Sequence, residues 1–372
     1  MQSFEYYAPT EIIFGKGAEA QTGKAVKKWG GTRVLLVYGG GSARRSGLLE
    51  RIQKELDDEN IFWEELGGVQ PNPRLSLAEE GAKKALKIQA DFILAVGGGS
   101  AIDTAKGIAH GAANPELDLW DIWTEKVELK KSIPVGVVLT ISAAGSEMSD
   151  SAVLTNEKIG RKKGLSTEFN RVKFAVMNPE LTYTLPKYQV TCGIVDIMMN
   201  TLDRYFTDSK GNEMTDEIGQ GLLRTVIRNG KKAFENQEDY QAMSELMWCG
   251  SLSHNGITGL GAEKDFAPHK ISHELSAKYD VAHGASLSAV WEAWARYVYM
   301  EEPERFAKYA RTVWDIREED PVKAACQGIQ PTVDYFRSIH MPVSIGELEI
   351  GVRPVEELED MARRATGNDT FT

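Results

Sequence analysis

A histidine-rich segment in the second half of the chain has the residue types and spacing of a metal site. His269, His273 and His283 lie within fifteen residues, in HKISHELSAKYDVAH. A helix would place His269 and His273 on one face, and His283 follows a short turn that could fold it back towards them. Imidazoles gathered in this way suit zinc or iron, whereas a solvated helix with incidental histidines is the alternative. The segment is not a zincin motif, because Lys270 stands where H-E-x-x-H requires glutamate.

A metal also needs a carboxylate, and Asp196 is the conspicuous one. It stands in the apolar segment GIVDIMM at 193–199, where burying an ionised acid is costly unless it is paired or bound to a metal. A helix N-cap is the alternative interpretation of Asp196. His110 and His340 stand alone in the sequence, and we interpret them as structural.

Two GGGS clusters, at 39–42 and 97–100, each follow a predicted strand and precede a predicted helix. Glycine lets the backbone approach a pyrophosphate, and a helix start offers free N–H groups and partial positive charge. Neither cluster matches G-x-G-x-x-G, because Arg44 and Ile102 occupy the last glycine position. A tight turn, with Ser100 as N-cap and Asp103 in the first helical turn, is the alternative. Two clusters at strand ends of one sheet favour a nucleotide.

The first half of the chain must supply a sheet that positions these glycines. Short β-rich apolar runs occur at 33–38, 61–66, 91–96 and 134–140. Segments with helical spacing separate them, as at 75–89. This alternation predicts βαβ units and a parallel sheet covered by helices. The opening FEYYAPTEIIFG is interpreted as a strand pair at the sheet edge.

From Pro186 to about Phe336, helical periodicity dominates. Thr215 can cap a helix that has one apolar stripe, and similar stripes recur at 241–253, 285–299 and 322–339. We therefore expect an α/β nucleotide-binding domain with a parallel sheet over residues 1–184. An all-helical metal and substrate domain should follow over residues 185–372.

Composition limits the classes of protein that the chain can represent. The 372 residues include 42% hydrophobic and 26% charged residues, as in a soluble globular protein with a sizeable core. The net charge of −11 argues against a nucleic-acid partner. No apolar run approaches the ~20 residues of a membrane span, and the N-terminus does not read as a signal peptide. The three cysteines lie far apart and fit neither a disulfide framework nor a cysteine zinc site. We expect a cytoplasmic protein.

With these pieces in place, the chain resembles the iron-dependent (group III) alcohol dehydrogenases, and most of all their butanol-dehydrogenase-like branch. The resemblance covers nearly the whole chain. It is carried by FEYYAPTEIIFGKG near the N-terminus, QPNP at 70–73, AVGGGSAIDTAK at 95–106, TISAAGSEMSDSAVLTN at 140–156, NPELT at 178–182, GIVDIMM at 193–199 and the histidine segment.

The resemblance implies a dinucleotide-binding α/β domain followed by a helical metal domain, the plan shared with dehydroquinate synthase. By resemblance, the nucleotide site comprises Gly39, Gly40, Ser42, Asn72, Gly98, Gly99, Ser100, Asp103, Thr140, Ser142, Ser146 and Lys162. Gly98, Gly99 and Ser100 would hold the pyrophosphate, and Asn72 and Lys162 would lie near the ribose or nicotinamide end. The implied metal ligands are Asp196, the residue four later, His269 and His283. His273 would lie beside substrate and nicotinamide as a proton relay rather than a ligand.

One of the implied ligand positions departs from the family pattern. The residue four after Asp196 is normally histidine, but this chain has Asn200. Asparagine offers a neutral carbonyl oxygen on a shorter side chain, a poorer ligand than imidazole for iron or zinc. Three protein ligands can still hold catalytic zinc, with water completing the shell. We therefore expect Fe²⁺ or Zn²⁺ at Asp196, Asn200, His269 and His283, with lowered affinity.

Cofactor choice follows from the first glycine cluster. In relatives that use NAD, an aspartate after the first nucleotide-binding strand holds the adenosine ribose and would repel a 2′-phosphate. This chain has Gly39 there, with Ser42, Arg44 and Arg45 nearby. Hydroxyl, backbone N–H and cationic groups without the anion favour NADP, with NAD as the second choice. A solvated helix face is the alternative interpretation of the arginines.

The resemblance implies a homodimer, and the resulting expectation is an enzyme that reversibly reduces aldehydes to primary alcohols of the butanol type. The metal would act as a Lewis acid on the carbonyl oxygen while the nicotinamide supplies hydride. One alternative, motivated by Asn200, is a degenerate member that binds nucleotide without efficient catalysis. Another is a sugar-phosphate cyclase, for which residues 259–274 offer only Lys264 and Lys270 as phosphate-binding cations.

Overall fold

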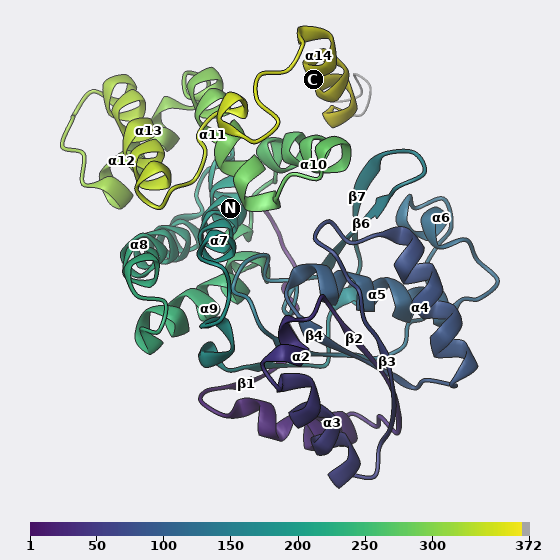
Figure 1. Ribbon diagram of the computed structural model, residues 1–372. Coiled ribbons are helices and arrows are strands. Elements are labelled where there is room, and N and C mark those ends of the chain that lie inside the picture. Colours follow the sequence, from purple (N-terminus) through teal and green to yellow (C-terminus); the bar gives the residue numbers. More distant parts are fainter. Residues whose placement is uncertain (367–372) are drawn as a thin grey trace. The chain divides into compact units, whose positions relative to one another are not determined.

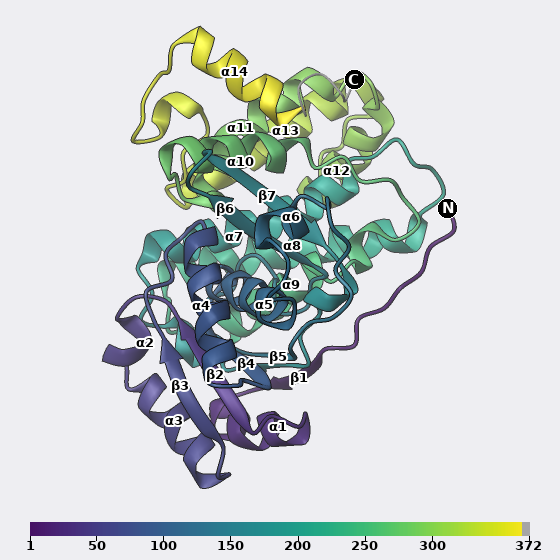
Figure 2. The same ribbon diagram turned by 90° about the vertical axis from the view of Figure 1, so that its right-hand side faces the viewer.

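A computed structural model describes residues 1–366 and divides the chain into two compact units (Figures 1 and 2). One unit is Tyr7–Thr184, and the other begins at Leu185 and also includes Met1–Tyr6. The expected division placed residues 1–184 in one domain, whereas the structure groups Met1–Tyr6 with the second unit. They are held in the second unit by hydrogen bonds such as that from the Gln2 N–H to the Gly261 carbonyl, at 3.0 Å.

A six-stranded parallel sheet forms the centre of the α/β unit. Its strands are β1 (Glu11–Phe14), β2 (Arg33–Tyr38), β3 (Phe62–Leu66), β4 (Phe92–Gly97), β5 (Val135–Leu139) and β8 (Phe174–Met177). Their order across the sheet is β1-β8-β5-β4-β2-β3. The parallel sheet is confirmed, and its β2, β3, β4 and β5 coincide with the four apolar runs. Because β2 and β4 are neighbours in parallel, the two GGGS clusters lie at the same edge of the sheet.

The expected strand pair at the N-terminus is wrong. Only Glu11–Phe14 forms a strand there, and it pairs in parallel with β8 at the sheet edge, Glu11 opposite Phe174. An antiparallel hairpin occurs instead between β6 (Ser151–Asn156) and β7 (Arg161–Ser166). The charged residues of β7 lack the apolar alternation that marks a strand in the sequence.

Helices cover both faces of the sheet. On one face, α1 (Thr22–Lys28) and α3 (Leu48–Asp58) pack their apolar side chains against β2, β4 and β8 in one buried core. On the other, α5 (Gly99–Ala113) lies against β4 and pairs with α4 (Leu75–Lys87). The remaining short elements of the unit are η1 (Ala18–Gln21), α2 (Ser42–Arg45), α6 (Leu119–Trp123), η2 (Glu168–Asn170) and η3 (Pro179–Thr182).

The second unit is built from helices. They are α7 (Lys187–Tyr205), α8 (Glu213–Glu235), α9 (Tyr240–His254), α10 (Ala267–Tyr279), α11 (His283–Val298), α12 (Pro303–Trp314), α13 (Pro321–Ser338) and α14 (Val355–Ala365), with short η4 (Ile257–Gly259) and η5 (Ile345–Glu347). The apolar stripes of the sequence correspond to α8, α9, α11 and α13. Thr215 lies inside α8 instead of capping it, because α8 begins at Glu213 and its N-cap is Asn212. The Thr215 hydroxyl donates to the Leu260 carbonyl at 3.2 Å.

Helix α7 lies at the centre of this unit and is buried over most of its length, in contact with α8, α9, α10 and α11. Among the described residues, no helix is long and apolar enough to cross a membrane.

Candidate active site

Three polar side chains lie along one face of α7. Asp196, Asn200 and Asp203 have the i, i+4, i+7 spacing of successive turns on one side of a helix. All three are buried, so each needs a partner. Asp196 stands in the middle of the helix, which excludes its alternative interpretation as an N-cap.

Asp203 fixes the orientation of His269. Its Oδ2 lies 2.7 Å from His269 Nδ1 and also accepts the His269 backbone N–H at 3.3 Å. That N–H is among the unsatisfied donors at the start of α10, so Asp203 both caps α10 and orients the imidazole. The contact places the ring proton on Nδ1 and leaves the Nε2 lone pair for a metal.

A chain of hydroxyls gives His283 the same tautomer. Its Nδ1 lies 2.9 Å from Ser272 Oγ, which lies 2.5 Å from Ser286 Oγ, and the Ser286 hydroxyl donates to the His283 carbonyl at 2.8 Å. The Ser286 hydroxyl uses its hydrogen in the bond to the His283 carbonyl, so Ser272 must be the donor between the two serines. The Ser272 hydroxyl then has no hydrogen left for His283, so His283 Nδ1 donates to Ser272. The proton of His283 is therefore on Nδ1, and its Nε2 lies 3.9 Å from Asp196 Oδ1.

A close approach between helices brings His283 to α7. Gly284, the next residue, lies against the α7 backbone, where a Cβ atom would come within 2.2 Å of the Cys192 carbonyl oxygen. Only glycine permits that contact, because any side chain would have to displace backbone. Cys192 precedes Asp196 by one turn, so the contact sets the start of α11 beside the carboxylate.

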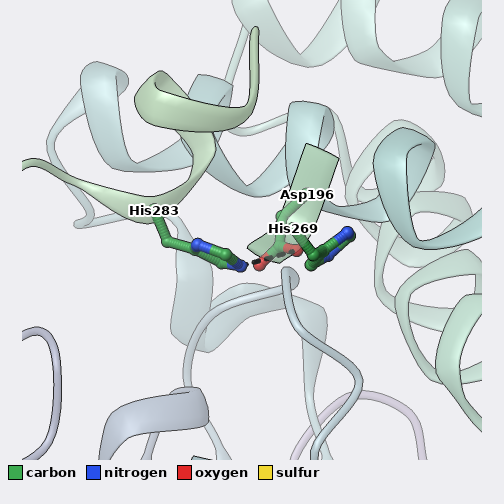
Figure 3. A group of neighbouring side chains, drawn as sticks. All are labelled: Asp196, His269 and His283. Carbon is green, nitrogen blue, oxygen red and sulfur yellow. Dashed lines mark ion pairs between the residues drawn. The ribbon is translucent and has the colours of Figure 1, made fainter. Parts of the chain in front are cut away.

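Asp196, His269 and His283 form a group that fits a divalent metal (Figure 3). One ligand atom from each residue lies within 4.8 Å of the others, and the His283 imidazole points towards the Asp196 carboxylate. His269 Nε2 is buried and has no hydrogen-bond partner among the described residues. A buried nitrogen without a donor or acceptor is costly unless a ligand completes it. Two imidazoles and one carboxylate are a donor set typical of iron(II) with open coordination positions.

The Asn200 side chain is not oriented as the expected metal ligand would be. Its Nδ2 donates to Asp196 Oδ1 at 3.0 Å, which directs the amide nitrogen, not the oxygen, towards the carboxylate. A donor nitrogen has no lone pair for a metal. In this arrangement Asn200 holds the Asp196 carboxylate in place.

His273 lies beside this group. Its ring centroid is 5.5 Å from that of His283 and 6.5 Å from that of His269, and the residue is partly exposed. His269 and His273 share a face of α10, as their spacing predicts.

The two glycine clusters differ in the space beside them: Gly39 and Gly40 of the first are open, whereas the second is closely packed. A Cβ atom on Gly40 would meet nothing within 4 Å, and one on Gly39 would meet only the Val69 carbonyl oxygen, at 3.5 Å. Gly98 precedes α5 and lies so close to Ile141 that a Cβ atom would collide with it. Gly99 and Ser100 form the first turn of α5, where free backbone N–H groups suit a phosphate. Ser100 therefore lies inside α5 and is not the N-cap of that helix, a position that Gly98 occupies.

Asp103 and Ser146 belong to a buried network that the sequence did not reveal. Ser146 Oγ donates to Asp103 Oδ1 at 2.6 Å, and Asp103 Oδ2 accepts the Val153 N–H at 3.0 Å. Lys106 Nζ, fully buried, donates to the Ser146 carbonyl and hydroxyl and to the Ser151 carbonyl, at 2.8–2.9 Å. Burial lowers the pKa of Lys106 to about 8. These contacts hold the serine-rich segment after β5 against α5.

The other predicted nucleotide residues are distributed around the same unit. Lys162 Nζ donates to Asn72 Oδ1 at 2.9 Å, so the structure brings this predicted pair together. Ser142 Oγ is buried without a hydrogen-bond partner among the described residues. Thr140 directly follows β5 and is partly exposed, while its N–H donates to the Gly97 carbonyl at 3.0 Å.

Sequence reasoning missed Asp203, Ser272 and Lys106. For Asp203 a signal was present, because it lies two helical turns after Asp196 on the same face. Lys106 stands one turn after Asp103 and could have been paired with it. For Ser272 the sequence holds no such signal, since its role depends on the approach of α11.

Comparisons with known proteins identify the family. The family model "iron-containing alcohol dehydrogenase" matches residues 9–179, and that of the C-terminal part of the Fe-containing alcohol dehydrogenase family matches 190–372.

Individual relatives agree with this assignment. An NADH-dependent butanol dehydrogenase A from Clostridium acetobutylicum is 39% identical over all of this chain and 95% of its own length. The NADPH-dependent aldehyde reductase YqhD of Escherichia coli is 34% identical over 93% of this chain and 89% of its own. The crystal structure of a butanol dehydrogenase A from Thermotoga maritima superposes with a TM-score of 0.94 at 35% identity, over 98% of this chain and 91% of that one. The chain therefore belongs to the iron-containing alcohol dehydrogenase family, in its butanol-dehydrogenase-like branch.

Proposed function

We propose that this protein interconverts aldehydes and primary alcohols of the butanol type, at an iron(II) centre held by Asp196, His269 and His283. Family membership makes the chain an oxidoreductase that uses a nicotinamide nucleotide and a divalent metal. One observation carries the assignment of the centre. Both imidazoles are held through Nδ1, by Asp203 and by Ser272, so each keeps its Nε2 lone pair for a metal, and one ligand atom of each histidine lies within 4.8 Å of an oxygen of Asp196.

The chain's own residues prepare this centre. Iron bound here supplies a Lewis acid that polarises a carbonyl oxygen. Asp196 contributes the anionic oxygen, and Asn200 fixes its orientation. Phe266 packs edge-on against His269, with ring centroids 5.2 Å apart, and its own face lies 4.6 Å from the Arg204 guanidinium. The aromatic ring excludes water from one side of that imidazole.

We place the nucleotide at the carboxyl ends of β2 and β4. Nicotinamide, when bound, supplies or accepts the hydride. Gly98, Gly99 and Ser100 offer the backbone N–H groups of α5 to the pyrophosphate, and Gly39 and Gly40 leave room for the adenosine ribose. The proposed nucleotide site also includes contacts to the cofactor from Asn72, Thr140, Ser142 and Lys162. Asp103 and Ser146 act through the position of the serine-rich segment, because their polar atoms bond to one another, to Lys106 and to the backbone.

His273 is the proposed proton relay. It is partly exposed and lies beside His283 without belonging to the metal-binding group. An imidazole changes protonation near neutral pH, so it can pass a proton between solvent and an alcohol oxygen.

NADP is the proposed cofactor, with NAD as the second choice. Position 39 carries no acid, and the Arg45 guanidinium lies over Gly41, where a Cβ atom would collide with it. A cation at this edge of the sheet suits a 2′-phosphate. The proposal also includes a homodimer, as the family resemblance implies, and a cytoplasmic location, as the composition and the separated cysteines suggest; light scattering and cell fractionation would test them.

Metal reconstitution tests the proposed function. The protein is stripped with a chelator, reloaded anaerobically with iron(II), and assayed for oxidation of NADPH and NADH in the presence of butyraldehyde. We expect activity that depends on both iron and aldehyde, and its loss in His269→Ala together with the bound iron. An iron-loaded protein without aldehyde-dependent turnover would favour the degenerate, nucleotide-binding alternative.

A further inference from the structure

Four side chains, those of Glu65, Tyr38, Arg44 and Gln53, meet near the first glycine cluster. Glu65, near the end of β3, lies opposite Leu36 of the neighbouring β2. Its Oε2 accepts the Tyr38 hydroxyl at 2.7 Å and Arg44 Nη2 at 2.5 Å, while its Oε1 accepts Gln53 Nε2 at 2.6 Å. Arg44 Nη2 also donates to the Tyr38 hydroxyl at 2.6 Å. Both oxygens of Glu65 are therefore engaged by donors from α2, α3 and β2.

The cluster contains a firmly ionised carboxylate. Burial raises the pKa of Glu65, but the hydrogen bonds from Tyr38 and Arg44 outweigh burial, and its pKa lies below the usual value. Burial and the Glu65 contact raise the pKa of Tyr38, so the phenol keeps its proton. The Arg44 side chain is half exposed and the Glu65 side chain one quarter exposed. Arg44 is thus an ion-paired cation that can still reach a solvent-exposed anion.

The cluster lies where the adenosine end of a dinucleotide is recognised. Tyr38 is the last residue of β2, and Gly39 and Gly40 follow with open space above them. In open α/β sheets an acid at this point binds the ribose hydroxyls of NAD, and an arginine accommodates the 2′-phosphate of NADP. This chain has no acid at position 39, but it brings the acid of Glu65 to Arg44 from the next strand.

We propose that Glu65 sets the cofactor preference by competing with the 2′-phosphate for Arg44. A 2′-phosphate must draw Arg44 away from Glu65, whereas a 2′-hydroxyl leaves the pair intact. The pair therefore limits the advantage of NADP and lets NAD bind at the same site. This inference rests on the proposed location of the adenosine ribose at the first glycine cluster.

Replacing Glu65 should strengthen binding of a 2′-phosphate selectively. The probes are adenosine 2′,5′-bisphosphate and adenosine 5′-monophosphate, titrated calorimetrically into full-length, iron-loaded protein. We expect Glu65→Gln to tighten binding of the bisphosphate by about fivefold, since a partly exposed ion pair contributes at most about 1 kcal/mol. Binding of the monophosphate should stay unchanged.

Two further variants make the test specific. Glu64→Gln is the matched control, because Glu64 is the adjacent acid on β3 and pairs with Lys84 at 3.4 Å instead of Arg44. This control variant should leave the affinities for the bisphosphate and for the monophosphate unchanged. In a protein that already carries Arg44→Met, Glu65→Gln should give no gain for the bisphosphate.

The outcomes separate this inference from the proposed function. One outcome is that both probes bind, with the ratio of bisphosphate to monophosphate affinity the same in Glu65→Gln as in Glu64→Gln. In that case Glu65 does not set the preference, and the inference is overturned. A gain that persists without Arg44 would overturn it as well. If neither probe binds the parent protein, the proposed nucleotide site itself is wrong.

Discussion

Asn200 donates a hydrogen bond from Nδ2 to Oδ1 of Asp196, at 3.0 Å, inside the centre of the helical unit. The contact joins the position at which this chain departs from its family to the only carboxylate of the proposed metal centre in the described residues. It also leaves Asn200 Oδ1 buried without a partner in that part of the chain. Where the family resemblance implies a histidine ligand, Asn200 thus directs a donor nitrogen at Asp196 and positions that carboxylate.

This arrangement predicts weaker metal binding than a fourth ligand would give. Asn200→His should raise metal retention, because histidine returns an imidazole to the same helix face. Asn200→Ala should lower it, because Asp196 loses a supporting hydrogen bond, a change that typically costs tenfold to a hundredfold in affinity. The measurement is iron content after dialysis against graded chelator. Equal retention in all three proteins would show that Asn200 does not influence the centre.

Asp203→Asn should weaken iron binding although Asp203 is not a ligand. An amide can accept the Nδ1 proton of His269 but carries no charge to strengthen the ligand. We expect a loss of affinity of about tenfold, measured by competition with a coloured chelator. The control is Asp334→Asn, which removes an acid that contacts Gln330 on α13. Unchanged affinity in Asp203→Asn would mean that packing alone orients His269.

Gly284→Ala should disrupt the centre through the backbone. The added Cβ would come within 2.2 Å of the Cys192 carbonyl oxygen, so α11 must move away from α7 and carry His283 with it. We expect a loss of roughly 1–3 kcal/mol in the free energy of unfolding, as for other overpacked sites, together with weaker iron binding. Gly221→Ala on α8 is the control, because its Cβ would meet only the end of Arg224, at 3.9 Å. The two variants are compared by urea denaturation and iron titration, and a stable, iron-replete Gly284→Ala protein would refute the argument.

His273→Ala should separate proton transfer from metal binding. The group of mutually close ligand atoms does not include His273, so iron content should stay at the parent level. Turnover should fall by about a hundredfold, the lower range for a lost general acid or base. The pH profile of turnover should also lose its imidazole limb. Loss of iron with activity would instead identify His273 as a ligand.

His110 should make the α/β unit sensitive to acid. It is fully buried, with Nδ1 2.8 Å from Ser132 Oγ and Nε2 2.8 Å from Asn170 Oδ1, as its structural interpretation requires. Burial lowers the pKa of His110 from 6.5 to about 4. Between these values the unfolded chain binds a proton that the folded protein does not, so stability falls as the pH falls from 6.5 towards 4.

The size of this effect can be measured directly. From pH 7 to pH 5 we expect His110 to account for a loss of about 2 kcal/mol in the free energy of unfolding. His110→Gln should be less stable at pH 7 but should lose less on acidification. His340→Gln, at an exposed position, should keep the parent's pH dependence. An unchanged slope in His110→Gln would show that other groups govern acid sensitivity.

Much of the fold could be predicted because it rests on local periodicity. Apolar runs matched β2 to β5, and apolar stripes matched α8, α9, α11 and α13. Asp196, His269 and His283 could be singled out because buried acids and clustered histidines are uncommon. Local patterns do not record which strands or helices meet, so they gave no view of contacts such as Glu65 with Arg44 or Ser272 with His283. Thr215 was misplaced for another reason: helix boundaries are weakly marked in a sequence, and α8 begins before Thr215, at Glu213.

The assignment of Met1–Tyr6 to the helical unit has a consequence for synthesis of the protein on the ribosome. Met1–Tyr6 are made before the rest of their unit, and Gln2 must wait for its hydrogen-bond partner Gly261, whereas all of Tyr7–Thr184 is made before α7 begins. The α/β unit is thus an insertion within the helical unit. It can fold during synthesis, while the helical unit is still incomplete. Because Asp196, His269 and His283 all lie in that later unit, the nascent chain cannot assemble the proposed metal centre until the start of α11 has emerged. The proposed centre therefore becomes available to a metal only late in synthesis, after the α/β unit is complete.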